Sequence, residues 1–549
     1  MQGALEGLDW VVIGLYFFVL LLLALWIFFQ KNKNTEDYFL AGRNVGWFVI
    51  GASIFASNIG SEHIVGLAGT GFETGTPMAH YELHSWIVLL LGWLFLPFYF
   101  RSGVYTMPEF LEKRFDSKSR WFLSLFSLIA YVLTKVSVTI YAGGIVVSEL
   151  IGVPFWYGSI GVVIFTGLYT IIGGMKAVIY TESMQAIVLI LGSLIITVLG
   201  LEEIGGWNEL KSTVIENSPN HFNMWRPSND PDFPWTGLLF GGTIVGLWYW
   251  CTDQYIVQRT LAANNIKIGR RGVIFGAYLK LLPIFIFLIP GIIAFALSIK
   301  DPNLFSIDKS DNAFPMLVKT LLPAGLKGLV AGGLMAALMS SLASVFNSCS
   351  TIFTIDIYKK ISPKKSEQYL VNVGKIATIV IVVLGIAWIP IMEKIGGGVM
   401  YQYLQNVQAY IAPPVTTVFL LGIIWKRVNA QAAIVTLFSG LFLLILRLGS
   451  EIATNEGVIN SGFLFEFASI NFSYMAIWMF LFSVILCISV SLLTSQPDYQ
   501  KIQGLSYGTL SKEDRISAEN SYSTIDIVLS VVLVLIVVGI LLFFSPVVF

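Results

Sequence analysis

Polar side chains that could hold an ion or a solute lie inside long apolar stretches of this sequence. The first group lies between Gly51 and Gly66, where Asn58, Glu62 and His63 interrupt an apolar run that also contains glycines. A helix break at this point would free backbone carbonyl oxygens, and a sodium ion is one partner for them inside a membrane. Close helix packing through small residues, with polar side chains bonded between helices, is the alternative interpretation.

A second group of uncharged oxygens lies in the segment 337–351. Ser340, Ser344 and Asn347 are spaced by four and three residues, so a helix places them on one face. Hydroxyl and amide oxygens without a full charge suit a monovalent hard cation, whereas calcium favours several carboxylates. A face of small residues that packs against a neighbouring helix would give the same pattern.

Aromatic and charged side chains in other apolar stretches could bind hydroxyl groups. Segment 248–254 begins with Trp-Tyr-Trp, and such rings either stack on a sugar or form a belt at a membrane interface. Lys135 and Lys280 also lie in apolar runs, where burying a lysine costs about 2.5–3.5 kcal/mol unless its ammonium reaches the interface. Four polar groups that can pair with sugar hydroxyls come from four different stretches: Glu82, His63, Lys280 and Gln405.

The composition explains why these polar residues stand out. Of 549 residues, 56% are hydrophobic and 12% are charged, whereas soluble domains carry about 25% charged residues. The formal net charge of zero gives no indication of a nucleic-acid partner. The three cysteines form no CxxC pair and the four histidines lack metal-ligand spacing, so we expect neither a disulfide framework nor a zinc site. The chain also lacks an activated nucleophile or a catalytic carboxylate pair, which argues against an enzyme.

The elements that must position these groups are membrane-spanning helices of about 20 apolar residues. Fourteen stretches fit, at 8–29, 44–72, 78–101, 121–149, 155–173, 178–200, 236–262, 272–299, 324–358, 368–390, 397–425, 430–449, 472–494 and 525–548. The first is too long for a signal-peptide core, so we interpret it as a retained helix.

The basic residues provide an independent check on this count. If the N-terminus lies outside and the helices alternate, the inner loops hold 23 of the 33 Lys and Arg residues and the outer loops hold eight. Cytoplasmic loops carry such an excess, and a miscounted helix would destroy it for every later loop. The pattern therefore predicts an even number of spans with both termini outside. The short loops favour a bacterial inner membrane.

With these motifs in view, the sequence resembles the solute:sodium symporter family, and within it the sodium/glucose cotransporters. The resemblance covers nearly the whole chain. It is carried by the motifs at 38–43 (YFLAGR), 51–60 (GASIFASNIG), 173–182 (GGMKAVIYTE), 248–254 (WYWCTDQ), 340–348 (SSLASVFNS) and 425–429 (WKRVN).

The resemblance implies an all-α, LeuT-like core of two inverted five-helix repeats, at 44–200 and 236–425, whose first and sixth core helices are broken. Residues 1–43 then hold an extra helix and the first inner loop, 201–235 an outer loop, and 426–549 three further helices. The co-transported ion is Na⁺. The implied sodium ligands are the backbone oxygens of Ala56, Ile59 and Ala337 and the hydroxyls of Ser340 and Ser341. The implied sugar-binding residues are Asn58, His63, Glu82, Tyr249, Trp250, Lys280 and Gln405, with Tyr249 as the inner gate.

Several positions depart from the family pattern. Position 63 follows the animal cotransporters, whereas the best-known bacterial relative has glutamine. Gly246 replaces an asparagine of that relative, which puts one hydrogen bond to the sugar in doubt, and Leu83 replaces a common tryptophan. Two-sodium members have aspartate at the position of Glu182 and a hydroxyl at that of Ala343, so we predict one sodium ion per sugar.

Three functions remain open at this point. The first is secondary active transport of a glucose- or galactose-like hexose with Na⁺. The second uses the same machinery for a polyol such as myo-inositol. The third, from another class, is a sodium-dependent sensor or leak channel, which would carry sodium without accumulating sugar. One anionic and one cationic residue in the expected site leave no net charge, so a neutral polyhydroxyl solute is favoured.

Overall fold

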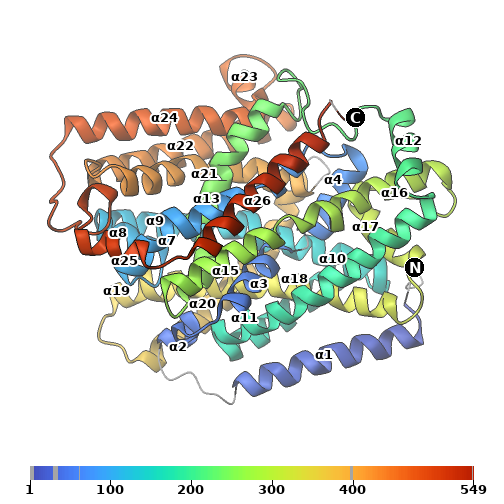
Figure 1. Ribbon diagram of the computed structural model, residues 1–549, viewed down its shortest axis with the longest axis horizontal. Helices are drawn as coiled ribbons and strands as arrows, with labels where there is room; N and C mark the ends of the chain where they lie inside the picture. Colours follow the sequence, from blue (N-terminus) through green and yellow to red (C-terminus); the bar gives the residue numbers. More distant parts are fainter. Residues whose placement is uncertain (1–4, 29–34, 61, 396–399, 547, 549) are drawn as a thin grey trace.

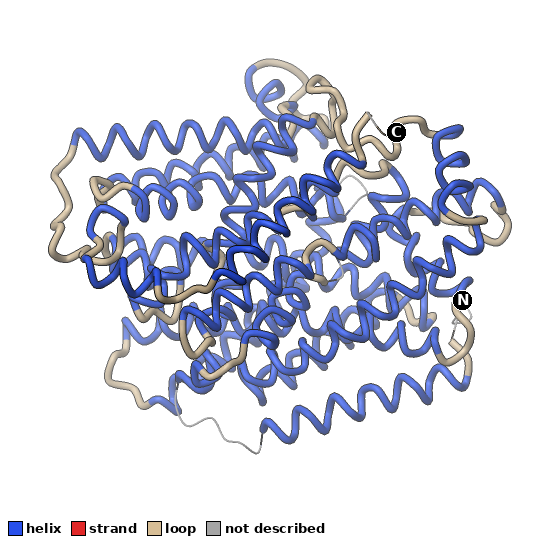
Figure 2. Tube along the Cα trace, in the orientation of Figure 1, coloured by secondary structure: helices blue, strands red, loops and turns tan. Residues whose placement is uncertain are grey.

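The structure is a computed structural model that describes residues 5–28, 35–60, 62–395, 400–546 and 548. Within these ranges the chain is helical, and the single β-type contact is an isolated bridge between Val45 and Ala263. Long helices lie side by side, and the loops gather at the two ends of the bundle (Figures 1 and 2). The side chain of Glu62, one of the polar residues noted in the sequence, lies outside the described part.

The helices follow one another along the chain with short connections. The first part contains α1 (Gly7–Phe28), α2 (Thr35–Leu40), η1 (Ala41–Arg43), α3 (Trp47–Asn58), η2 (Glu62–Leu67), α4 (Ala68–Glu73), α5 (Ala79–Glu82), α6 (Ser85–Leu90), η3 (Leu91–Phe95), α7 (Leu96–Ser102), α8 (Met107–Arg114), α9 (Ser117–Tyr131), η4 (Val132–Val136), α10 (Ser137–Ile151), α11 (Phe155–Ile204) and α12 (Trp207–Asn217). The middle part contains η5 (Gly237–Gly241), α13 (Gly242–Cys251), α14 (Gln254–Leu261), α15 (Ile266–Leu279), η6 (Ile284–Leu288), α16 (Ile289–Lys300), η7 (Ser310–Asn312), α17 (Ala313–Leu321), α18 (Leu326–Thr351), η8 (Ile352–Tyr358) and α19 (Lys359–Ile361). The last part contains α20 (Glu367–Ile395), α21 (Met400–Ile424), α22 (Ala430–Asn455), α23 (Phe463–Ser469), α24 (Phe472–Leu493), η9 (Tyr507–Thr509), α25 (Lys512–Glu519) and α26 (Thr524–Phe543).

Ten of the described helical segments are long and apolar enough to cross a membrane, and there are eleven if the bent pair 47–58 and 63–73 counts as one span. The three remaining predicted spans coincide with shorter apolar helices at Gly7–Leu23, Phe155–Ile164 and Gly237–Cys251. The chain is therefore a multi-pass membrane protein, and the count of fourteen stays a prediction.

Local sequence signals set where many helices begin and end. Thr106, Asp116 and Asn429 cap α8, α9 and α22, because each side chain accepts a hydrogen bond from a backbone N–H in the first turn. Gly152 follows α10 with φ 80°, a conformation that glycine adopts without strain. These short polar and glycine signals are visible in the sequence, although the predicted spans are placed from the lengths of apolar runs.

Helix α18 lies at the centre of the bundle, and α26 lies at its surface. In the most apolar stretch of the span 326–361, which contains α18, 94% of the residues are buried within the protein. In the corresponding stretch of α26 only 17% are buried. Helix α18 packs against α11, α1, α10 and α20. Small residues such as Gly332, Ala336 and Ala337 allow this close packing on several sides. Among the candidate spans in the described residues, the segment with the serines predicted to bind sodium is thus the most enclosed.

Segments predicted on the same side of the membrane contact one another. At one end, Asp9 accepts hydrogen bonds from the backbone N–H groups of Gly325 and Gly328, at 2.6 and 2.7 Å. At the opposite end, Arg101 forms an ion pair of 2.9 Å with Asp514. Helix α1 begins and α26 ends toward the same end of the bundle (Figure 1). Each of these contacts joins segments that the loop assignment puts on the same side, and the outside location of both termini stays a prediction.

Both helices that the resemblance expects to be broken are interrupted. Helix α3 ends at Asn58, and the chain then bends by 62° into the segment 63–73. Helix α13 ends at Cys251, and α14 begins at Gln254 after two non-helical residues. Asp253 caps α14 by accepting from the backbone N–H of Tyr255, so the second break has a local cause.

A buried ion pair closes the end of the bundle near α8. The Arg120 guanidinium lies 2.6 Å from Asp356 Oδ1 and 2.5 Å from Glu112 Oε2, and it joins α9 to η8 and α8. Thr106 also donates to Asp356, at 2.7 Å. Although burial raises it, the pKa of Glu112 is held at about 2 by hydrogen bonds from Lys360, Ser117 and Arg120. The Glu112 carboxylate is therefore charged at neutral pH.

We predict that Arg120→Ala destabilises the protein by about 3–5 kcal/mol, because it leaves the Asp356 carboxylate buried without its cation. The measurement is the thermal unfolding midpoint in detergent, with exposed Lys118→Ala as the control for loss of a nearby positive charge. An unchanged midpoint for Arg120→Ala would contradict the structural role of this pair.

Candidate functional site

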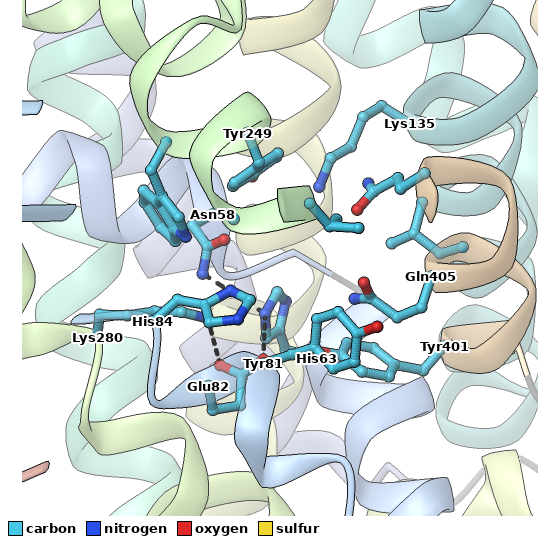
Figure 3. A pocket seen from close by; sticks show the side chains of 15 residues that line it. Asn58, His63, Tyr81, Glu82, His84, Lys135, Tyr249, Lys280, Tyr401 and Gln405 are labelled. Carbon is cyan, nitrogen blue, oxygen red and sulfur yellow. Dashed lines mark hydrogen bonds and ion pairs between the residues drawn. The ribbon is translucent and has the colours of Figure 1, made fainter. Parts of the chain in front are cut away.

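A pocket in the middle of the bundle collects polar side chains from several segments (Figure 3). All seven residues predicted from the resemblance to bind sugar line this one pocket: Asn58, His63, Glu82, Tyr249, Trp250, Lys280 and Gln405. They come from the end of α3, η2, α5, α13, the residue after α15, and α21.

Glu82 is the centre of the pocket's bonding. Its Oε2 forms an ion pair with Lys280 Nζ, and its Oε1 accepts a 2.6 Å hydrogen bond from the Tyr401 hydroxyl. The same Oε1 lies 3.3 Å from His63 Nε2, and the Asn58 amide lies 3.5 Å from that nitrogen. Four segments distant in sequence therefore meet at one carboxylate, which is 1% exposed.

Two lysines contact aromatic rings on the same helix. Lys280 Nζ lies 5.5 Å from the centre of the Trp250 ring, and Lys135 Nζ lies 4.8 Å from that of Tyr249. A cation in this position is stabilised by the electron-rich face of the ring. Lys135 is 4% exposed, so the interpretation that its ammonium reaches the membrane interface is wrong. The three rings of residues 248–250 are buried as well, which excludes a lipid-facing aromatic belt.

A close approach of two segments brings Tyr401 to Glu82. A Cβ at Gly66 would lie 3.0 Å from the backbone nitrogen of Tyr401, so the turn after His63 packs directly on the start of α21. Nothing in the sequence singles out Tyr401, because a tyrosine at the start of an apolar helix is common at a membrane interface.

Some polar atoms in the pocket have no hydrogen-bond partner within the described part of the chain. They are His63 Nδ1, the Tyr81 hydroxyl oxygen and Gln405 Oε1. Burying such a group costs about 1–3 kcal/mol unless it is paired. These atoms can bond to a polar solute, and together they offer both donors and acceptors.

The residues predicted to bind sodium lie on two helices that pack together. Ala56 and Ile59 are at the end of α3, and the other three, Ala337, Ser340 and Ser341, are on α18, which contacts α3. The hydroxyls of Ser340 and Ser341 are buried and have no partner in the described residues. Oxygens of this kind can bind a monovalent cation.

A second buried ion pair joins these two helices. Glu182 on α11 accepts hydrogen bonds from Ser53 of α3 and Ser344 of α18, and Arg259 on α14 lies 2.9 Å from its Oε1. Arg259 also donates to Ser344. Ser344 is therefore already bonded, although the sequence placed it on one face with Ser340.

The residues predicted to bind sodium can be placed along α3 and α18 relative to Ser53 and Ser344, which bond to Glu182. Arg43, which precedes α3, and Asp356, which follows α18, both contact the loop 103–106, so the two helices run in opposite directions. One turn beyond Ser53 on α3 and one turn before Ser344 on α18 therefore lie toward the same end. Ala56 occupies the first position, and Ser340 and Ser341 occupy the second. Asn347, expected on the same face, instead donates to Met175 Sδ at 3.1 Å and is turned to α11.

Comparisons with known proteins give consistent results. A family model described as the sodium:solute symporter family matches residues 38–440. The chain is 38% identical to sodium/glucose cotransporter 1 of Oryctolagus cuniculus, over 93% of its own length and 83% of that protein. It is also 38% identical to the sodium/myo-inositol cotransporter of Homo sapiens, over 95% and 78%.

Two solved structures have a similar fold. A substrate-bound, outward-open Na⁺-coupled sialic acid symporter matches with a TM-score of 0.76 at 24% identity, covering 90% of this chain and 99% of that one. A nucleobase-cation-symport-1 family transporter matches with a TM-score of 0.54 at 13% identity, covering 86% and 99%.

We predict that Lys280→Gln lowers the unfolding midpoint strongly, because the buried Glu82 carboxylate loses its cation at a cost of about 3–5 kcal/mol. The double variant Lys280→Gln with Glu82→Gln removes both charges and is expected to be more stable than Lys280→Gln alone. Thermal unfolding in detergent of the wild type, both single variants and the double variant measures the coupling. A double variant that loses the sum of the two single effects would show that the pair contributes no coupling energy.

Proposed function

The chain belongs to the sodium:solute symporter family, which confirms the resemblance stated from its motifs, and from this premise we propose that it transports a neutral hexose together with Na⁺ by alternating access. The observation that carries the proposal is the pocket around Glu82. It combines an internally neutral ion pair with unpaired donors and acceptors, and with aromatic rings on one wall.

The ion pair in the pocket favours an uncharged solute. The Glu82 carboxylate and the Lys280 ammonium neutralise each other, so an ionic substrate would have to separate them in a buried site. A hydroxyl needs no such separation, because it can donate to one group and accept from another. In our proposal Asn58, His63, Glu82, Lys280 and Gln405 bind substrate hydroxyls, and Trp250 packs against the ring of the sugar.

A second candidate substrate is a cyclic polyol such as myo-inositol. The chain resembles a sodium/myo-inositol cotransporter as much as a sodium/glucose cotransporter, at 38% identity in each case. Both solutes are neutral and rich in hydroxyls, so the same groups would serve either.

We assign the sodium site to the space between α3 and α18. The ligands would be the backbone oxygens of Ala56, Ile59 and Ala337 together with the hydroxyls of Ser340 and Ser341. This assignment is supported by the break after α3 and by the two buried hydroxyls without partners. Both helices also contribute to the sugar pocket or pack beside it, so ion binding can influence the shape of the pocket.

Tyr249 is proposed as the inner gate. It lies two residues before the end of α13, where the helix is interrupted, and its ring faces Lys135 of η4. Movement at this break would move the ring relative to the substrate. The fourteen spans, the inverted repeats at 44–200 and 236–425, the outside location of both termini and the inner-membrane location belong to the same proposal.

Purified protein in proteoliposomes should accumulate labelled D-glucose, D-galactose or myo-inositol when an inward Na⁺ gradient is imposed. Glu82→Ala and Gln405→Ala should abolish uptake by removing substrate contacts, and Ser341→Ala should abolish it by removing a sodium ligand. Each loss is expected to exceed about tenfold in kcat/KM.

Exposed residues of the same types provide the matched controls: Glu203→Ala, Gln503→Ala and Ser469→Ala, which should transport as the wild type does. Normal uptake in all three site variants would remove the site assignment. Sodium flux without uphill accumulation of any of the three solutes would instead favour a channel or sensor.

The environment of Glu182 supports a coupling ratio of one sodium ion per substrate. Arg259 already supplies a positive charge to this carboxylate, and Ser344 is bonded to both. Ala343 adds no oxygen. A second sodium ion at this position would have to displace a buried guanidinium, so one binding site between α3 and α18 remains.

We predict a Hill coefficient near one for Na⁺ in uptake and a 1:1 ratio of ²²Na⁺ to labelled substrate. At 100 mV one charge supplies about 2.3 kcal/mol, so the potential alone supports an accumulation on the order of 50-fold. Ala343→Ser should leave the ratio at one, since Arg259 still neutralises Glu182. A measured ratio of 2:1 in the wild type would contradict the prediction.

A further inference from the structure

One wall of the pocket is formed where α13 lacks side chains. Gly242 and Gly246 are one helical turn apart and therefore lie on the same face of α13. A Cβ at position 246 would lie 2.8 Å from His84 Nδ1 and 2.6 Å from Ile87 Cδ1, and a Cβ at position 242 would lie 3.5 Å from His84 Nε2. The imidazole of His84 therefore occupies the slot that the two glycines leave open.

This imidazole is part of the pocket wall. His84 lines the pocket together with Gly246 and Tyr81 and is 6% exposed (Figure 3). Its ring packs edge-on against the ring of Tyr81, with centroids 5.4 Å apart. The Tyr81 hydroxyl is buried and has no hydrogen-bond partner among the described residues. The wall thus offers an imidazole and a phenol that can both bond to a solute.

The imidazole in this slot bears on the hydrogen bond to the sugar that a glycine at position 246 cannot make. A polar side chain at position 246 and the imidazole of His84 cannot both fit, because a side chain there would overlap the ring. A neutral imidazole has one donor and one acceptor nitrogen, so it can supply a bond of either sense to a hydroxyl.

We propose that His84 is a specificity-determining residue of the substrate site, and that its imidazole, held in the Gly242–Gly246 slot, supplies the hydrogen bond that a polar side chain at 246 would otherwise make. The inference rests on the proposed function, since it assumes that the pocket binds a polyhydroxyl solute. Gly246 acts by leaving room for the ring. The Tyr81 hydroxyl is placed to bond to the same region of the substrate.

The test compares D-glucose with its 1-, 2-, 3-, 4- and 6-deoxy analogues in Na⁺-driven proteoliposome uptake, measuring KM and kcat separately. A site built to bond a hydroxyl rejects the analogue that lacks it. In the wild type the analogue that lacks the hydroxyl bonded by His84 should raise KM by about tenfold or more, in addition to any analogue that lacks a hydroxyl bonded by another residue of the pocket. His84→Leu should raise KM for D-glucose about tenfold with little change in kcat, and should abolish discrimination at that one position. His84→Gln, which keeps a donor and an acceptor, should restore part of it.

Gly246→Ala is a second route to the same result, because the added Cβ displaces the imidazole without removing it. It should reproduce the His84→Leu profile, and it carries the test if His84→Leu does not fold. Gly14→Ala is the matched control, since a Cβ at position 14 would meet no atom within 4 Å. If the wild type accumulates myo-inositol and not glucose, monodeoxy inositols replace the deoxyglucoses.

The outcomes separate this inference from the proposed function. A wild type that accumulates none of D-glucose, D-galactose and myo-inositol with Na⁺ would overturn the proposed function. A wild type that transports, with a His84→Leu variant that loses affinity equally for every analogue or retains the wild-type pattern of discrimination, would overturn the role of His84 and leave the transport function intact.

Discussion

A carboxylate buried in a membrane-embedded bundle must be neutralised and hydrogen-bonded, and Glu82 satisfies this requirement with side chains from other segments. Lys280 comes from the end of α15, Tyr401 from α21 and His63 from the turn after the break in α3. Because each partner stands on a different element, the carboxylate fixes the relative depth of those elements. The pocket is the space that remains between them, so its shape depends on this ion pair.

The second buried pair, Glu182 with Arg259, has a different bonding pattern and therefore suits a different role. Its carboxylate is surrounded by Ser53, Ser344 and the guanidinium, which are bonded to it. Around Glu82, by contrast, several buried atoms of the lining side chains have no partner in the described residues. A solute rich in hydroxyls can form hydrogen bonds with the side chains around Glu82 without breaking any existing bond. An ion that approached Glu182 would have to compete with an arginine already in place.

Much of the site could be predicted because a polar residue in an apolar helix is conspicuous. Glu82, Lys280 and Gln405 stand out against their neighbours, and they do meet in one pocket. The breaks in α3 and near Asp253 also have local signals, in glycines and a capping aspartate. What the sequence could not reveal is which distant side chain completes each bond. Tyr401 reaches Glu82 only because Gly66 allows two segments to touch, and neither residue reports on the other along the chain.

The number of membrane spans could not be determined from the sequence, for a different physical reason. Hydropathy measures the length of an apolar run, and it identifies neither the bend after α3 nor the continuation of one helical element through 155–204. Contacts between loops carry information that length does not. Asp9 with the start of α18, and Arg101 with Asp514, each join segments that the charge distribution placed on one side. Those contacts tie together helices whose individual lengths leave the number of crossings open.

Gly246 illustrates why the binding role of a residue in a relative cannot always be assigned to this chain by comparing the two motifs one position at a time. Protein interiors are closely packed, so the volume that a missing side chain leaves must be filled from elsewhere. On α13 that volume is filled by an imidazole from the segment after α5, which brings its own polar atoms to the pocket. The hydrogen-bonding capacity at this wall is therefore a property of the pair Gly246 and His84. A comparison that considers position 246 alone records a lost contact, whereas the packing indicates a contact that has moved to His84, in the turn between α5 and α6.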